Sequence, residues 1–332
     1  MNKKLPVWEN DVNVLLIFFI RDEVLSKTFE AVRKARPRRL LLWQDGARDN
    51  RPDDVEKINK CRQIVENIDW DCEVYKNYQT RNWGCDPSTF YSHKWAFSLV
   101  DKCIVLEDDG VPSQSFFKYC KELLDKYEKD LRIAKICGLS PVQNYPSNVS
   151  YRFSTVGSLG WASWRRVADT WDEDYTFLDD EEKMRLYKNL FNSRADKQYL
   201  ELCKKHRDSR KPHWETIQTF ARIFNNQLNI IPTVNMIHNI GLGEDSTHSN
   251  ININSIPANM RDSFYQAALE IPFPLVHPTA VIDDVQYLEE YNKQTGVGKT
   301  AIQSFIYRVK RINGRVFSGD FKGLFKSLKN RF

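Results

Sequence analysis

Residues 103–109 read Cys-Ile-Val-Leu-Glu-Asp-Asp, an apolar run that ends abruptly in three carboxylates, Glu107, Asp108 and Asp109. The apolar run is typical of a strand in the interior of a sheet. Three acidic side chains at its carboxyl end are costly to bury unless a cation or hydrogen-bond donors compensate them. In open α/β sheets, ligands bind at the carboxyl ends of the strands. We therefore expect this strand end to bind a divalent metal and a phosphorylated ligand, although an acidic turn capping the next helix is the structural alternative.

The first 140 residues alternate between short apolar runs and amphipathic helical patterns. Apolar runs at residues 14–20 and 40–43 predict strands, and each precedes a helical pattern, the second of which begins at Val55. A polar loop is expected at residues 79–87, and a last strand at residues 133–137. This order predicts an α/β fold, with a mixed, mostly parallel Rossmann-like sheet and helices on both faces.

The pattern changes after about Tyr145. Residues 179–210 form a charged helical stretch, and further periodic runs predict a helix at residues 214–224 and a strand at residues 228–232. Residues 239–254 are rich in Gly, Asn and Ser and predict a loop.

Residues 299–332 form a distinct basic tail. They contain nine Lys or Arg residues and one acidic residue, Asp320, whereas the net charge of the whole chain is only +5. Two apolar helical stripes run through them, so we expect basic amphipathic helices that bind an anionic membrane surface. Packing on the body or on a second subunit is the alternative. The nearly neutral body argues against a nucleic-acid enzyme.

The expected compartment is the cytoplasm. No apolar run is long enough to span a membrane, and the amino terminus lacks the apolar core of a signal peptide. The seven scattered cysteines contain no C-x-x-C pair and are typical of reduced thiols. If the tail binds lipid, the protein would lie on the inner face of the cell membrane.

Several segments, all in one order, resemble the GT-A nucleotide-sugar glycosyltransferases. Within that family the chain is most similar to the N-acetylglucosaminyltransferase that initiates complex N-glycans and to its bacterial relatives. The segments are LLLWQDGAR (40–48), FYSHKWAF (90–97), CIVLEDDGVPSQSFFKY (103–119), GSLGWASW (157–164), HWET (213–216) and GEDSTHS (243–249). The tail lies outside this resemblance.

The resemblance implies a GT-A fold and metal-dependent, inverting transfer of a sugar from a nucleotide-diphosphate donor, a UDP-sugar in the first instance. Glu107-Asp108-Asp109 would correspond to the family's D-x-D motif. Asp109 would then bind Mn²⁺ or Mg²⁺, Asp108 would bind the ribose, and Glu107 would accept hydrogen bonds. Asp45 would contact the uracil ring, and Arg21 would lie near the nucleotide.

Glu215 is the candidate general base, because an inverting transferase needs one carboxylate to deprotonate the acceptor hydroxyl. Glu244, Asp245 and Asp172 are rivals. A preference of acids for the first turn of a helix would explain Glu215 without any catalytic role. His248 follows a flexible Gly-Glu-Asp-Ser-Thr run and could reach the metal or the diphosphate as a loop closes.

Other residues have two interpretations each. Arg81 could pair with a phosphate or remain a solvated charge. Trp161 and Trp164 could offer a flat face to a sugar ring or pack in the core. The turn after the first strand (Phe-Phe-Ile-Arg-Asp-Glu, 18–23) has no glycine-rich loop, which argues against a nucleotidylyltransferase or a dinucleotide-binding protein.

The expected organisation is a nucleotide-sugar-binding half (1–140), an acceptor-binding and catalytic half (141–298) and the basic tail (299–332). The expected reaction is hexosyl or N-acetylhexosaminyl transfer to a glycan or lipid-linked glycan in bacterial surface polysaccharide synthesis. Two alternatives remain. One is another metal-dependent nucleotide enzyme, such as a nucleotidylyltransferase, and the other is a non-catalytic binding scaffold.

Overall fold

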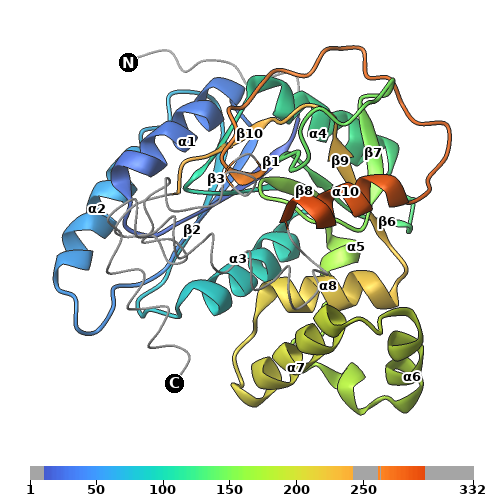
Figure 1. The fold of residues 1–332 in the computed structure, drawn as a ribbon. Coiled ribbons are helices and arrows are strands. Elements are labelled where there is room, and N and C mark those ends of the chain that lie inside the picture. Colours follow the sequence, from blue (N-terminus) through green and yellow to red (C-terminus); the bar gives the residue numbers. More distant parts are fainter. Residues whose placement is uncertain (1–10, 242–260, 262, 296–332) are drawn as a thin grey trace, which may run out of the picture.

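A mixed sheet forms the centre of the molecule (Figure 1). The structure, a computed structural model, describes residues 11–241, 261 and 263–295. Within these residues the sheet has eight strands in the order β3-β2-β1-β4-β8-β6-β9-β7. Their bounds are β1 (Asn13–Phe18), β2 (Arg39–Gln44), β3 (Glu73–Tyr78), β4 (Lys102–Glu107), β6 (Ile133–Cys137), β7 (Tyr151–Ser154), β8 (Trp161–Trp164) and β9 (Leu228–Pro232).

Most of the strands are parallel. β3, β2, β1 and β4 pair in parallel, and so do β6 and β9. β8 is antiparallel to both of its neighbours, β4 and β6, and β7 is antiparallel to β9. The predicted α/β class with a mixed, mostly parallel sheet is therefore confirmed.

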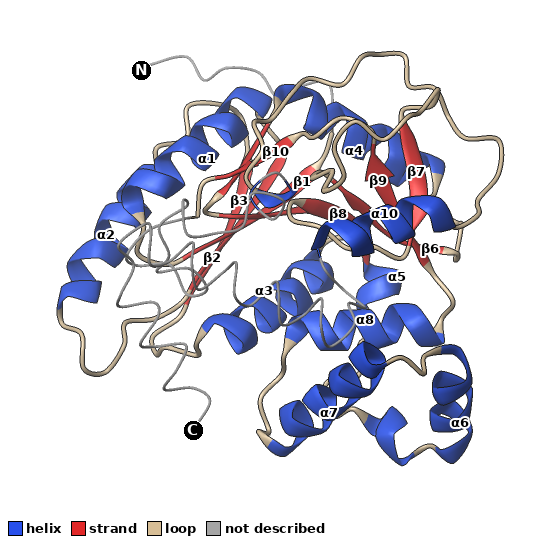
Figure 2. Ribbon diagram, in the orientation of Figure 1, coloured by secondary structure: helices blue, strands red, loops and turns tan. Residues whose placement is uncertain are grey.

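Helices cover both faces of this sheet (Figure 2). Leu16 and Leu106 face α1 (Asp22–Ala35), α2 (Asp53–Val65) and α4 (Gln114–Lys126). Leu15 and Val105, one residue away along the same strands, face α3 (Cys85–Leu99) and α8 (Trp214–Phe224). Because successive side chains of a strand point to opposite faces, one apolar run supplies both layers of the core.

Further elements lie below and beside these layers. α5 (Arg165–Ala168), η1 (Thr176–Asp179), α6 (Glu181–Leu190) and α7 (Arg194–Asp208) connect β8 to α8, and α10 (Val285–Thr295) packs near β7. Figure 1 shows α6 and α7 as a helical pair beyond α8, away from the sheet.

Helix ends mostly follow the sequence signals. α1 ends where Arg36 adopts a left-handed conformation (φ 46°), directly before Pro37. The predicted loop at residues 79–87 is too long, because α3 already begins at Cys85, after Gly84 (φ 83°) turns the chain. Pro87 is compatible with this start because a helix has no internal partner for its first N–H groups. Val55 does not belong to the buried stripe of α2, since its side chain is 53% exposed.

A second, two-stranded sheet extends the acidic strand. β5 (Gly110–Pro112) follows the acids directly and pairs antiparallel with β10 (Ile237–Asn239). The three carboxylates therefore lie at the junction of the two sheets. The main sheet takes strands from both sides of residue 140, and the division of the chain at that point remains a prediction.

The basic tail at residues 299–332 lies outside the described residues. The amphipathic helices expected there therefore remain a prediction. Among the residues that the structure does describe, none of the helices is long and apolar enough to cross a bilayer.

Candidate functional site

Two of the three acids at the end of β4, Asp108 and Asp109, contact one cation, Arg21, from the turn between β1 and α1. Arg21 Nη2 donates to Asp108 Oδ1 and lies 2.9 Å from Asp109 Oδ2, while its Nε lies 3.3 Å from Asp108 Oδ2. Thr28 Oγ1 donates a hydrogen bond of 2.7 Å to the backbone carbonyl of Asp108. Because β1 and β4 are neighbouring strands, the fold places Arg21 next to the acids. The nucleotide is expected at the same strand ends.

One arginine does not balance three carboxylates. Burial raises the pKa of Glu107, and the charges of Asp109 and Asp108 raise it further. Burial also raises the pKa of Asp108, although the Arg21 charge opposes that rise. A buried carboxylate holds its proton when too little positive charge is near it. The cluster therefore favours the binding of further positive charge.

The donor atoms suit a hard cation such as Mn²⁺ or Mg²⁺, which prefers carboxylate oxygen. Among residues 11–241, 261 and 263–295, however, no group of three His, Cys, Asp or Glu side chains is arranged to hold a metal. Mg²⁺ often uses only one or two carboxylates, with water and substrate phosphates completing its shell. Asp109 and its neighbours thus fit a partial ligand set that a diphosphate would complete.

The chain returns to the acids at Gly241. The Ile240 N–H donates to the Asp109 carbonyl (2.9 Å), and the Gly241 N–H donates to Asn239 Oδ1 (2.9 Å). A Cβ atom at Gly241 would lie 2.1 Å from Asp109 Oδ2, so any larger residue would displace that carboxylate. The segment that follows, with Glu244, Asp245 and His248, lies outside the described residues, and their predicted roles remain predictions.

Asp45 joins two loops beside the acid cluster. Its carboxylate accepts hydrogen bonds from the backbone N–H groups of Gly46 (3.0 Å), Trp83 (3.0 Å) and Gly84 (3.1 Å). Burial raises the pKa of Asp45 to about 6, against the lowering effect of these N–H groups. A Cβ atom at Gly46 would lie 2.5 Å from the Arg81 backbone, which requires glycine at this contact. Asp45 therefore fixes the loop at residues 79–84, and its contact with uracil remains a prediction.

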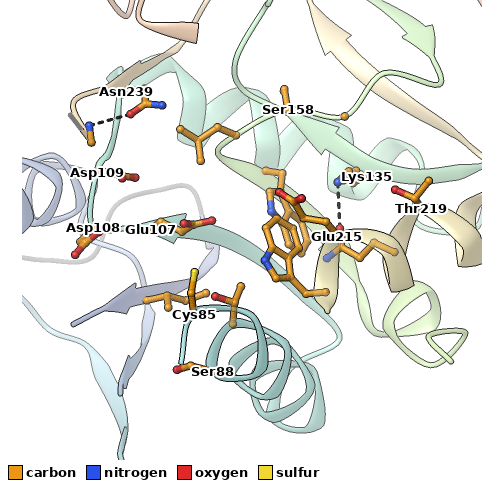
Figure 3. Close-up of a pocket in the computed structure, with 18 of the residues that line it drawn as sticks. Cys85, Ser88, Glu107, Asp108, Asp109, Lys135, Ser158, Glu215, Thr219 and Asn239 are labelled. Carbon is orange, nitrogen blue, oxygen red and sulfur yellow. Dashed lines mark hydrogen bonds between the residues drawn. The ribbon is translucent and has the colours of Figure 1, made fainter. Parts of the chain in front are cut away.

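A cavity of about 790 Å³ links the acid cluster to the far half of the sheet. In Figure 3, Glu107, Asp108 and Asp109 lie on one side, and Lys135, Glu215 and Thr219 lie on the opposite side. Cavities of a few hundred to about 1,000 Å³ are typical of small-molecule sites. The two walls come from the end of β4 and from β6 with α8.

Glu215 lies in the first turn of α8, on the wall opposite the acids, and its side chain is exposed at the cavity. This position allows a carboxylate to contact both a bound ligand and solvent. Any acid at a helix amino terminus interacts favourably with the helix dipole, so this preference could also explain Glu215 without a catalytic role.

Of the other candidates, Trp161 lines the cavity and the rest do not. Asp172 accepts a hydrogen bond from Thr176 Oγ1 (2.9 Å) and is not among the residues lining the cavity. Arg81 is exposed, with its guanidinium 3.7 Å from the ring centroid of Trp83, and does not line the cavity either. Trp161 lines the cavity, whereas Trp164 is buried and donates to the Leu124 carbonyl (3.1 Å).

Sequence reasoning missed the polar residues of the far wall, namely Lys135, Gln218 and Arg222. Two signals could have identified them. Lys135 is a single cation within the otherwise apolar strand 133–137, and such strands are buried on both faces. Gln218 and Arg222 follow Glu215 at the spacing that places side chains on one face of a helix.

Comparisons with known proteins give only weak likenesses. No family model matches the chain, and no curated protein matches it. Among solved structures, a 4-diphosphocytidyl-2C-methyl-D-erythritol synthase from Anaerococcus prevotii is 11% identical with a TM-score of 0.32, over 49% of this chain and 74% of that one. A UDP-glucose pyrophosphorylase complexed with UDP-glucose is 9% identical with a TM-score of 0.29, over 48% and 78%. Likenesses this slight do not bear on the reaction, and the resemblance to glycosyltransferases remains a prediction.

Proposed function

We propose that this chain is a metal-dependent glycosyltransferase that takes a sugar from a nucleotide-diphosphate donor, in the first instance a UDP-sugar. The observation that supports this most is the single cavity with Glu107, Asp108 and Asp109 on one wall and Glu215 on the opposite wall. Sugar transfer with inversion needs this separation, because the leaving diphosphate and the base act on opposite faces of the anomeric carbon.

Each residue has a role in this proposal. Asp109 holds the cation, which would neutralise the charge that develops on the departing diphosphate. Asp108 and Glu107 accept hydrogen bonds from the ribose and its surroundings, and Arg21 holds Asp108 and Asp109 in place. Glu215 accepts the proton of the acceptor hydroxyl, and the freed oxygen attacks the anomeric carbon.

The acceptor is a glycan or lipid-linked glycan of a bacterial surface polysaccharide, and residues 299–332 bring the enzyme to the membrane. The basis for the membrane contact is the local excess of basic residues in the sequence. Sedimentation with vesicles containing phosphatidylglycerol tests it, with the full chain and a chain ending at Gly298. Equal sedimentation of the two would refute the membrane role.

Nucleotidylyl transfer is the second candidate, since it would use the same acidic strand end. The turn from β1 to α1 contains Arg21 and no glycine, and so lacks the backbone amides that a phosphate-binding loop presents. This favours sugar transfer. Because both reactions would use the acidic strand end, the first experiment must separate them.

The experiment is calorimetric titration with UDP, with and without Mn²⁺, on the wild type and on Asp109→Ala. Metal-dependent binding that the variant loses supports the site. Product analysis then follows: release of UDP from a UDP-sugar supports glycosyl transfer, and release of pyrophosphate from UTP and a sugar phosphate supports nucleotidylyl transfer. If UDP does not bind with any metal, the other nucleoside diphosphates are titrated next, and if none of them binds, the glycosyltransferase proposal is wrong and the scaffold alternative gains support.

A further inference from the structure

The far end of the cavity contains two cations that the proposed reaction does not use. Lys135 lies in β6, and Arg222 lies in α8, two turns after Glu215; both line the cavity. Lys135 Nζ lies 3.1 Å from Gln218 Oε1, and Arg222 Nη1 lies 3.2 Å from the Gln227 carbonyl. Among the residues that the structure describes, neither cation forms a salt bridge within 4.0 Å, although the Glu215 charge acts on Lys135 and the Asp283 charge acts on Arg222 from further away.

Burial makes these charges costly. It lowers the pKa of Lys135, and the nearby Arg222 charge lowers it further, while Glu215 acts in the opposite direction. Burial lowers the pKa of Arg222 as well, opposed by Asp283 and Tyr199. Half-buried cations without an ion-pair partner are destabilising, so the presence of two of them together favours the binding of an anion that the described residues do not supply.

Two further polar groups at this end are unsatisfied. Gln218 is 9% exposed and its Nε2 has no hydrogen-bond partner; Asn229 is 1% exposed and its Oδ1 has none. Asn229 is the register partner of Lys135, and both residues line the cavity with Gln218. Buried polar atoms without partners are rare in folded proteins. A ligand with hydroxyl groups and a negative charge would satisfy all four side chains.

We propose that this end of the cavity binds the carboxylate of a sugar acid, with Lys135 and Arg222 as its ion-pair partners. The inference rests on the proposed glycosyl transfer and specifies its substrate: one of the two sugars that meet in the cavity is a glycuronic acid. Glu215 and Asp283 offset part of the positive charge, so a singly charged carboxylate matches the site better than a phosphate dianion. Gln218 Nε2 and Asn229 Oδ1 then pair with the hydroxyl groups of the same ring.

The test compares sugars that differ only at the carboxylate. In the donor arm, UDP-glucuronic acid is titrated against UDP-glucose, and UDP-galacturonic acid against UDP-galactose, all with Mn²⁺. In the acceptor arm, the methyl glycosides of the same four sugars are titrated with and without UDP. In one arm we expect the acid to bind at least about tenfold more tightly than its neutral counterpart, as a charge-assisted pair would give.

Substitutions then test whether Lys135 and Arg222 cause the preference for acidic over neutral sugars. Lys135→Gln and Arg222→Gln should each reduce the acid-to-neutral ratio to near one while leaving the binding of the neutral sugar unchanged. Arg222→Lys should restore part of the ratio. Lys94→Gln is the control, because Lys94 is also half-buried but lies outside the cavity and bonds the Ala168 carbonyl. Melting temperatures verify that each variant is folded.

Two outcomes would overturn the inference. Equal binding of acid and neutral sugars by the wild type in both arms excludes a carboxylate site. A loss of UDP affinity in Lys135→Gln, equal to its loss of affinity for both UDP-sugars, would assign the cations to the diphosphate. Failure of the proposed function can be told apart from failure of this inference. If UDP does not bind the wild type, the titrations of the glycosides without nucleotide still decide whether the carboxylate site exists.

Discussion

The two ends of the cavity carry opposite charges and balance them differently. At the end of β4, Arg21 contacts two of the three carboxylates directly, and negative charge remains in excess. At the far end, Lys135 and Arg222 face Gln218 and the Gln227 carbonyl, with no carboxylate in contact among the described residues. A cavity with this polarity orients a ligand before any close contact forms, because each end attracts the opposite charge.

The strongest test of the acidic end is Asp109→Asn. The substitution keeps the shape of the side chain but removes one negative charge, so the affinity for UDP in the presence of Mn²⁺ should fall by about a thousandfold, which corresponds to about 4 kcal/mol. Calorimetry measures the loss.

The control for Asp109 is Asp101→Asn, at the opposite end of the same strand, where the carboxylate is 81% exposed. It should bind UDP like the wild type. Equal losses in the two variants would mean that the effect is general electrostatics and not a metal site.

Glu215→Gln tests the opposite wall. If Glu215 is the base, the rate of UDP release from the donor in the presence of acceptor should fall by about 10² to 10⁴, with UDP binding unchanged. The matched control is Glu181→Gln, an exposed acid in the first turn of α6, which has the same favourable interaction with a helix amino terminus. If both variants lose only stability, Glu215 has a structural role.

The acidic end could be predicted from the sequence because its residues are contiguous. An apolar run that ends in three acids is visible in one line of sequence, and Arg21 follows from the adjacent position of β1. The far end could not be predicted in the same way, since β6, β9 and α8 each contribute only one or two of its residues. Only the tertiary pairing of Lys135 with Asn229, and the packing of α8 on the sheet, bring them together.

Most elements of the fold followed from hydrophobic periodicity, and the predicted bounds of α8 and β9 match the structure. The differences have local causes. The start of α3 depends on the backbone conformation of Gly84, which residue type alone does not decide, since a glycine adopts many conformations.

The pH dependence of stability reports on His93, which packs beside the far end of the cavity. His93 is fully buried against Trp161, Trp171 and Trp214. Burial, and then the Lys135 charge, lower its pKa to about 3. The unfolded chain binds this proton below about pH 6.5, whereas the folded protein does not, so His93 makes stability fall as the pH falls from 6.5 towards 3.

Between pH 8 and pH 5, the wild type should therefore lose about 2 kcal/mol more unfolding free energy than His93→Phe. Urea denaturation at the two pH values measures the difference. Parallel losses in the two proteins would show that His93 is protonated in the folded state as easily as in the unfolded chain.

The smallest expected effect concerns Lys135 in the free protein. Lys135→Met removes a half-buried charge that has no ion-pair partner among the described residues and keeps much of the side-chain volume, so it should raise the free energy of unfolding by about 1 kcal/mol. For a chain of this size the melting temperature should rise by about 2 °C. Lys94→Met is the control. A lower melting temperature for Lys135→Met would mean that the Gln218 contact stabilises the folded protein by more than the buried charge costs.

Trp161 separates the two charged ends. Its strand, β8, lies between β4 and β6, and Trp161 pairs with Val105 on one side and with Cys137 on the other. Glu107 and Lys135 are each two residues from those partners, on the same face of the sheet, and Lys135 Nζ lies 5.4 Å from the centre of the Trp161 ring. The ring therefore lies between the acid cluster and the Lys135 ammonium, and it holds that cation at the far end of the cavity by a cation–π contact. A small residue at position 161 would remove this contact and join the two ends of the cavity more widely.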